Sequence, residues 1–315
     1  MTDTAALPGI LDAEGLAPTS VGLWQIASRR LMRRKSAIVG MVVLGILILI
    51  ALTAQWIAPY SPTKVLLGVE KVKQREAPCI HLLGCPADKP QHIAGIDGNV
   101  RDQFSRLLYG ARLSLMVGFS TVTFAIIIGT VLGALGGYFG GWVDNLIMRV
   151  MDVLLAFPSL LLAIAIVTVL GPGLINALLA IGIVSIPAYA RVVRASVLSV
   201  REMDYVSATR ALGASNMRIL FQRILPNALT PLIVQGTLGI ATAILDAAAL
   251  SFLGLGAQPP TPEWGAMLGA ERNQVFTAPH LVFLPGAAIA LTVLSFNLLG
   301  DGMRDALDPR LAHMS

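Results

Sequence analysis

Six long apolar stretches constrain the fold of this chain more than any other feature of its sequence. They cover residues 37–58, 113–138, 153–170, 174–190, 229–250 and 281–300. Five of them contain no charged residue, and the stretch 229–250 contains only Asp246. A helix that crosses a bilayer needs about 20 predominantly apolar residues. The sequence therefore predicts an all-α membrane protein with six transmembrane helices.

The composition agrees with a membrane protein. Of the 315 residues, 55% are hydrophobic and only 13% are charged, whereas soluble domains carry about 25% charged residues. The net charge of +5 is small, and no basic stripe is interleaved with aromatic residues, which argues against a nucleic-acid partner. Four His and two Cys residues form no cluster at zinc spacing, so we expect no metal site and no cofactor.

The distribution of basic residues predicts the orientation in the bilayer. Basic residues gather just before the first stretch and between the fourth and fifth: Arg29, Arg30, Arg33, Arg34, Lys35, Arg191, Arg194, Arg201, Arg210, Arg218 and Arg223. The positive-inside rule places both segments in the cytoplasm, which gives an N-in/C-in topology. Residues 59–112 also hold eight basic residues. Long loops obey the rule weakly, and we expect this loop outside.

These boundaries divide the chain into five parts. We expect a disordered tail over residues 1–20, and then an amphipathic segment with the first transmembrane helix over 21–58. An extracytoplasmic loop follows over 59–112. A core of five transmembrane helices spans 113–303 with a cytoplasmic loop at 198–226, and a cytoplasmic tail covers 304–315. Residues 21–35 suit either a helix on the inner membrane surface or a solvated basic segment.

Three further positions are candidates for function. Cys79 and Cys85 lie close together in the expected outer loop, where they form either a small disulfide ring or two unrelated thiols. Asp246 suits a pathway or gating role, because a carboxylate inside a membrane is costly unless it is paired, protonated or facing water. It equally suits an interfacial position near the outer end of its stretch. Phe157 and Pro158 predict a kink, as helices that line pathways often have.

The polar stretch 204–226 is too rich in arginine to cross a bilayer and is patterned as two short helices broken at Gly213. Tyr205, Ala208 and Leu212 fall at helical spacing, and Ser215 is placed to cap the second helix. Such a loop fits a cleft on a soluble partner or rests on lipid headgroups, and the pattern leaves both open. No phosphate-binding loop occurs in the chain. The chain itself is therefore not expected to be an enzyme, and any energy must come from a partner.

Several motifs carry a family resemblance. Gly213 is followed at a fixed distance by Leu225 and Pro226, and further matches cover residues 104–115, 249–265 and 297–310. The chain resembles the inner-membrane permease subunits of binding-protein-dependent ABC importers, and specifically the C-type subunit of dipeptide, oligopeptide and nickel systems. The similarity covers about residues 20–310. Residues 95–102 depart from the run usual in the family, which puts any binding-protein contact there in doubt.

The resemblance implies a mechanism and a set of partners. It implies the ABC type I importer permease fold in a bacterial or archaeal plasma membrane. A second permease subunit would complete a heterodimer, two cytoplasmic ATP-binding subunits would drive it, and an extracytoplasmic binding protein would deliver di- or oligopeptides, or alternatively nickel. The coupling loop would use Ser207, Ala208, Thr209, Gly213, Ile224, Leu225 and Pro226. The triplet 207–209 departs from the family pattern, which usually has a glutamate.

Overall fold

The computed structural model describes residues 28–307. The predicted tail at 1–20 lies outside this range, as do most of the segment 21–35 and the end of the tail 304–315. The elements are α2 (Lys35–Ile57), η1 (His81–Leu83), α3 (Gln103–Phe139), α4 (Gly141–Leu155), α5 (Ser159–Leu170), α6 (Leu174–Arg201), α7 (Asp204–Ala211), α8 (Asn216–Ile219), η2 (Leu220–Ile224), α9 (Leu225–Ala228), α10 (Thr230–Phe252), α11 (Trp264–Glu271), η3 (Arg272–Gln274) and α12 (His280–Leu307).

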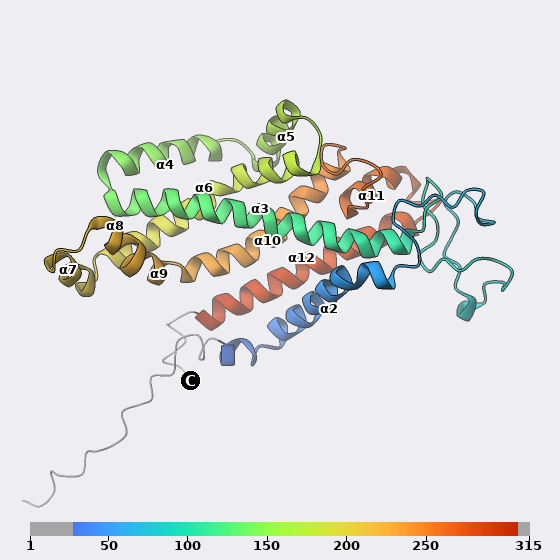
Figure 1. Ribbon diagram of the computed structural model, residues 1–315, viewed down its shortest axis with the longest axis horizontal. Coiled ribbons are helices and arrows are strands. Elements are labelled where there is room, and N and C mark those ends of the chain that lie inside the picture. Colours follow the sequence, from blue (N-terminus) through green and yellow to red (C-terminus); the bar gives the residue numbers. More distant parts are fainter. Residues whose placement is uncertain (1–27, 308–315) are drawn as a thin grey trace, which may run out of the picture.

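Long helices run side by side along the longest axis of the molecule (Figure 1). Helix α3 packs against α2, α6 and α10, and α12 packs against both α2 and α10. Five helices, α2, α3, α6, α10 and α12, are each long and apolar enough to cross a membrane, and α4 with α5 forms a sixth if the bent pair is one span. The prediction of an all-α membrane protein is thus confirmed.

The third span differs from the predicted stretch 153–170. Helix α4 begins at Gly141, and its axis is bent by 92° from that of α5 at the break before Ser159. Pro158 explains the break, because it lacks a backbone N–H and disfavours helical geometry at the residue before it. Phe157 and Pro158 are both exposed at this bend. The expected kink is therefore a sharp corner.

Helix α3 begins at Gln103, ten residues before the predicted start at residue 113. The Asp102 side chain caps it by accepting a hydrogen bond of 2.7 Å from the backbone N–H of Ser105. Such a cap satisfies one of the free donors at a helix start. The last part of the predicted outer loop is consequently the first part of a long helix.

Close packing of α3 on α6 forms the centre of the core. Gly133 of α3 lies so close to α6 that an added Cβ would collide with the carbonyl oxygen of Ala190. Gly129 and Gly137, one turn away on either side, also face α6. Small residues at this spacing let two helix backbones approach closely. Helix α6 itself continues through Pro187.

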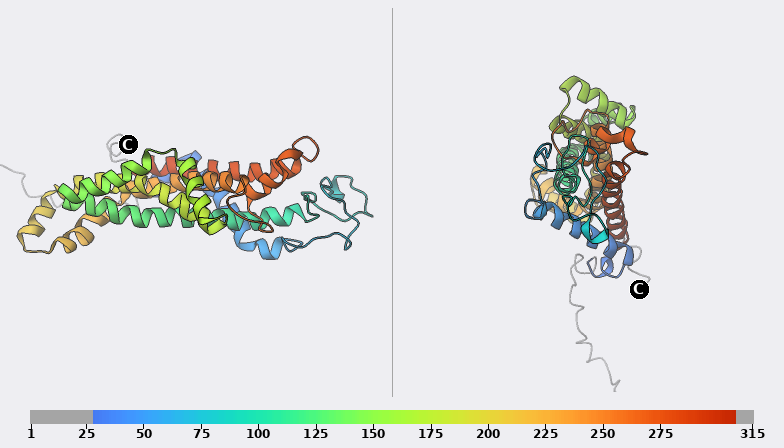
Figure 2. Two further views of the ribbon diagram at one scale, coloured as in Figure 1. Left: turned by 90° about the horizontal axis from the view of Figure 1, so that it is seen from above. Right: turned by 90° about the vertical axis from the view of Figure 1, so that its right-hand side faces the viewer.

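The molecule has two unlike ends. The start of α2 and the end of α12 lie together, joined by an ion pair of 3.4 Å between Arg34 and Asp305. The same end carries α7, α8 and α9, whereas the loop that follows α2 extends past the opposite end (Figures 1 and 2). The two ends of the described chain thus share one side with the loop 204–226.

Candidate coupling loop and pathway face

The loop after α6 folds as two helical segments that turn at Gly213. Helix α7 ends at Ala211, and Gly213 has a φ of +79°. A Cβ at Gly213 would meet nothing within 4 Å, so glycine is required by the left-handed backbone rather than by space. Ser215 precedes α8, but its side chain makes no capping hydrogen bond. The predicted break is confirmed, and the predicted side-chain cap is wrong.

Four side chains anchor this loop to the helical core. Val206, Ile219, Leu220 and Ile224 are all fully buried. Helix α8 continues through η2, a π-helical turn, into α9 without a gap. Burial of four aliphatic side chains contributes about 1.5–3 kcal/mol each. The loop is thus a packed element with one face held by its own protein.

The other face of the loop is apolar and open. Leu212 is 88% exposed, and Tyr205 and Ala208 are exposed beside it. These are the residues that the helical spacing selected as an apolar stripe. These three residues do form a stripe, but the stripe points away from the chain's own core. The side of α7 that carries Val206 packs against the core instead. An apolar face that its own protein leaves uncovered is typical of a contact surface.

Polar contacts fix the position of α7 against the helices around it. The Tyr205 hydroxyl donates to the Arg223 carbonyl oxygen at 3.3 Å, and the Asn227 amide donates to the same oxygen at 2.8 Å. At the base of the loop, the Tyr138 hydroxyl donates to the Asn216 side-chain oxygen at 2.9 Å. Arg201 donates to the carbonyl oxygen of Gly137 at 3.0 Å. The open face is therefore held in a defined position at the end of α3.

The residues expected to couple to a partner differ in their exposure. Six are exposed or half-buried, namely Ser207, Ala208, Thr209, Gly213, Leu225 and Pro226. Ile224 is fully buried. The structure brings all of them into one loop. Ile224 therefore acts on the loop's packing, and the exposed residues are free for contact.

Ion pairs hold the bent third span against α6 near this loop. Arg194 makes two charge-assisted hydrogen bonds to Asp144 of α4. Arg191 bonds to Asp152 at 2.6 Å between two exposed side chains. Bidentate pairs between Arg and a carboxylate are the strongest of these contacts. Part of the arginine cluster that indicated a cytoplasmic side thus also fixes α4.

Asp246 lies on α10, six residues before the helix ends at Phe252, which corresponds to about 9 Å along the helix. It is 16 residues after Thr230, which corresponds to about 24 Å along a helix. The side chain is half-buried, and within residues 28–307 it makes no hydrogen bond or ion pair. Helix α11 packs on the opposite side of α10, where Gly265 touches Ala248. Phe157 and Pro158 lie apart from it in the chain, at the corner between α4 and α5.

A cluster of buried charges supports the opposite end of the molecule, and sequence patterns missed it. Asp97 accepts hydrogen bonds of 2.8 Å from the backbone N–H and from Nε of Arg101. Glu271 accepts hydrogen bonds of 2.8 Å from Arg75 Nε and from the Gly98 N–H. These partners are up to 196 residues apart. The charges looked like those of any solvated loop, and only their pairing could have revealed the cluster.

His92 and a disulfide belong to the same part of the structure. His92 is buried with Nδ1 2.8 Å from Asp102 and Nε2 3.2 Å from Glu70. Burial alone would lower the pKa of His92, but the two carboxylates outweigh it, and the net pKa is raised. Cys79 and Cys85 are joined by a disulfide, with their Cα atoms 5.4 Å apart. Of the two alternatives for these cysteines, the structure has the closed ring.

Comparison with known proteins identifies the class. Residues 119–313 match the family model described as "Binding-protein-dependent transport system inner membrane component". Residues 22–78 match "N-terminal TM domain of oligopeptide transport permease C". The chain therefore belongs to the family of binding-protein-dependent transport system inner membrane components, a family of multi-pass membrane permeases.

The names of similar proteins indicate which members of this family the chain resembles most in sequence. The chain is 50% identical over 295 residues to the dipeptide transport system permease protein DppC of Alkalihalophilus pseudofirmus, covering 93% of this chain and 92% of the relative. It is 48% identical to the di/tripeptide transport system permease protein DppC of Pseudomonas aeruginosa, covering 88% and 89%. The glutathione transport system permease protein GsiD of Pectobacterium atrosepticum is 44% identical, covering 98% and 96%.

A solved structure shares the fold. A chain of the MetNI methionine ABC transporter, in an inward-facing crystal form, superposes with a TM-score of 0.53 at 20% identity. The match covers 64% of this chain and 96% of that chain. The ABC importer permease fold expected from the resemblance is thereby confirmed.

Proposed function

We propose that this chain is the C-type permease subunit of an ATP-driven importer of di- and oligopeptides. The observation that carries the proposal is the loop 204–228, which has one face packed on the chain's own core and an exposed apolar face. The loop lies at one end of the molecule (Figure 1). The names of three relatives, two for di- or tripeptides and one for glutathione, support a peptide as cargo. None of these names favours nickel.

Three kinds of partner follow from this proposal. A second, homologous permease subunit completes the pathway as a heterodimer. Two cytoplasmic ATP-binding subunits grip the open faces of the coupling loops, and an extracytoplasmic binding protein delivers the peptide. Closure of the ATP-binding subunits pulls the loops together and turns the cavity from inward to outward facing. The coupling surface of this subunit is formed by Ser207, Ala208, Thr209, Gly213, Leu225 and Pro226, and the buried Ile224 supports it from within the loop.

The orientation is part of the proposal. The basic residues before α2 and in the coupling loop support an inner position for that end of the molecule, and the Arg34–Asp305 pair holds both ends of the described chain there. The disulfide ring then lies on the oxidising side of the membrane, where such bonds persist. We assign the corner at Phe157–Pro158 and Asp246 to the pathway side of the subunit.

Purification of the tagged chain from its native membranes tests the proposal. The expected result is co-purification of a second six-span permease and one or two ATP-binding subunits, with ATP hydrolysis stimulated by a binding protein loaded with peptide. Screening that binding protein with peptides and with nickel decides the cargo. A chain that comes out alone and well folded, or a binding protein that takes only nickel, contradicts the corresponding part of the proposal.

A further inference from the structure

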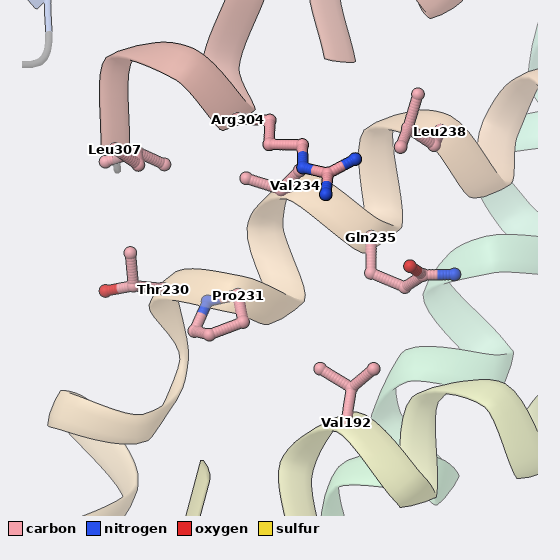
Figure 3. A pocket seen from close by; sticks show the side chains of 8 residues that line it. All are labelled: Val192, Thr230, Pro231, Val234, Gln235, Leu238, Arg304 and Leu307. Atoms are coloured by element: carbon pink, nitrogen blue, oxygen red, sulfur yellow. The ribbon is translucent and has the colours of Figure 1, made fainter. Parts of the chain in front are cut away.

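A groove of about 450 Å³ lies beside the coupling loop, between α6, α10 and α12 (Figure 3). Its lining is apolar except for three side chains, those of Arg304, Gln235 and Thr230. Arg304 projects from the last turn of α12 toward α10, and Val192 of α6 lies on the other side of α10. Thr230 is the first residue of α10, so the groove adjoins the end of the coupling loop.

The charge in this groove has no partner among the residues that the structure describes. Across residues 28–307, no hydrogen bond or ion pair engages the Arg304 guanidinium. The nearest acid in sequence, Asp305, is paired with Arg34 instead. A planar guanidinium beside an amide and a hydroxyl matches a carboxylate, which it can bind through two parallel hydrogen bonds. The chemistry of the groove therefore calls for an anionic group attached to an apolar body.

The groove is the end of a polar stripe along α10. Thr242 and Asp246 lie 7 and 11 residues after Gln235. With 3.6 residues per turn, both positions return to within about 20° of the direction of Gln235. Gln235 and Asp246 are half-buried and Thr242 is exposed, whereas Gly239 on the same side of α10 is buried against Tyr189 of α6. One side of this span thus carries three polar groups and ends at Arg304.

The stripe favours an aqueous pathway over lipid as the surroundings of the groove. An arginine at a helix end can reach lipid headgroups, so Arg304 alone would suit either. Asp246 lies about 24 Å from the start of α10 and about 9 Å from its end at Phe252, and a carboxylate in a span is costly against lipid chains unless it is paired, protonated or facing water. Three polar groups on one side of this span therefore favour water over lipid as its surroundings. The groove lies on the same side of α10 and is assigned to the same surroundings.

We propose that the groove around Arg304 and Gln235 is a carboxylate site at the inner mouth of the pathway, which receives the C-terminal α-carboxylate of the arriving peptide. This inference rests on the peptide-importer function proposed above. Asp246, farther out on the same face, offers the opposite charge to a peptide amino terminus. The two charges lie too far apart for a dipeptide to meet both at once, so they act in sequence along the pathway.

The test uses the permease pair with its ATP-binding subunits in phosphatidylcholine nanodiscs, without binding protein or ATP. A pool of tripeptides of mixed sequence is supplied as free acids and as C-terminal amides, and the retained peptides are quantified by mass spectrometry. The variants are Arg304→Gln, Arg304→Lys and Gln235→Leu. Arg149→Gln is the matched control, because Arg149 is an exposed arginine on α4 outside the groove.

The wild type is expected to retain free acids in preference to amides. Loss of a charge-assisted hydrogen bond reduces binding about ten-fold or more, so Arg304→Gln abolishes the preference, Arg304→Lys keeps part of it, and Arg149→Gln leaves it unchanged. Equal retention of acids and amides by the wild type, no retention, or an unchanged preference in Arg304→Gln overturns the inference.

Two further measurements separate the outcomes. Uptake of the same pool by proteoliposomes that hold the complete wild-type system reports on the proposed function itself. Uptake without an acid preference at the groove refutes the groove site alone, whereas no uptake of any peptide refutes peptide import. Phosphatidylglycerol that co-purifies with the wild type, is lost in Arg304→Gln and displaces peptide would instead assign the groove to lipid.

Discussion

The loop after α2 and the loop after α6 differ in whether their charged side chains are buried and paired. In the outer structure, the side chains of Asp97 and Glu271 are only 6% and 8% exposed, and arginine and backbone donors enclose both. In the inner loop 204–228, no ion pair forms among the described residues, and Leu212 stands 88% exposed. One loop satisfies its own polar groups, and the other leaves its face open.

This difference indicates that the two loops have different roles. A loop whose central charges are buried and paired in this way can keep its shape without a partner. A loop that is anchored on one face and open on the other keeps a surface ready for contact. Variants that break one loop should therefore act on stability, and variants that break the other should act on assembly.

Asp97→Ala should have the largest effect on stability. It leaves Arg101 and Arg106 buried next to a lost carboxylate, and breaking a buried pair in this way costs about 3–5 kcal/mol. Both arginines lie close to Asp97, with Arg106 Nε 3.4 Å from its carboxylate. Thermal unfolding in detergent measures the loss. The control is Asp88→Ala, an exposed acid of the same loop, which should leave the midpoint unchanged; equal midpoints for the two variants would contradict the account.

Gly213→Val should break assembly with little effect on insertion. A left-handed backbone costs a non-glycine residue about 1–2 kcal/mol or more, which displaces the open face and reduces binding of ATP-binding subunits about ten-fold or more. Gly254→Val is the matched control, since Gly254 has a φ of +81° and also meets nothing within 4 Å. Co-purification measures both variants. Equal loss of ATP-binding subunits in both would assign the effect to strain alone.

Cys79→Ser combined with Cys85→Ser should destabilise the outer loop more weakly. The ring closes over a sequence separation of 6, and the chain-entropy relation gives about 2 kcal/mol for a ring of this size. Limited proteolysis between α2 and α3 is the measurement: the double variant should be cleaved faster than the oxidised wild type and at the rate of the reduced wild type. Cleavage of the double variant at the rate of the oxidised wild type would show that the ion pairs alone hold the loop.

His92→Gln should have the smallest effect, and the effect should depend on pH. The folded pKa of His92 is raised above its ordinary value of 6.5, so its ion pairs stabilise the fold fully below that value and are lost as pH rises through the folded pKa. The difference in melting temperature between wild type and variant should therefore shrink from pH 6.5 upward. A difference that grows with pH would mean that the histidine is neutral between its two carboxylates.

The sequence predicted the features that depend on neighbours along the chain. Long apolar runs predicted the spans, because length and hydropathy alone decide whether a helix can cross a bilayer. Gly213 predicted the turn between α7 and α8 for a similarly local reason. The stripe of Tyr205, Ala208 and Leu212 was found, but which side of α7 would be buried depends on contacts with distant helices.

Features that depend on distant partners escaped prediction. The pairing of Glu271 with Arg75 joins residues 196 positions apart, and nothing in either neighbourhood signals it. The start of α3 at Gln103 was missed because polar residues at its beginning are buried by the outer loop rather than by lipid. The corner before Ser159 was expected only as a kink, since Pro158 restricts the local backbone without fixing the angle between two helices.

Photo-crosslinking from the open face of the inner loop tests the central claim most directly. A photoreactive benzoylphenylalanine replaces Leu212 in one variant and Leu82 in another, two leucines that are 88% and 93% exposed at opposite ends of the molecule. Irradiation of native membranes should join the Leu212 variant, and not the Leu82 variant, to a cytoplasmic ATP-binding subunit. Absence of that product at Leu212, or its formation from Leu82, would contradict the assignment of the inner loop as the coupling surface.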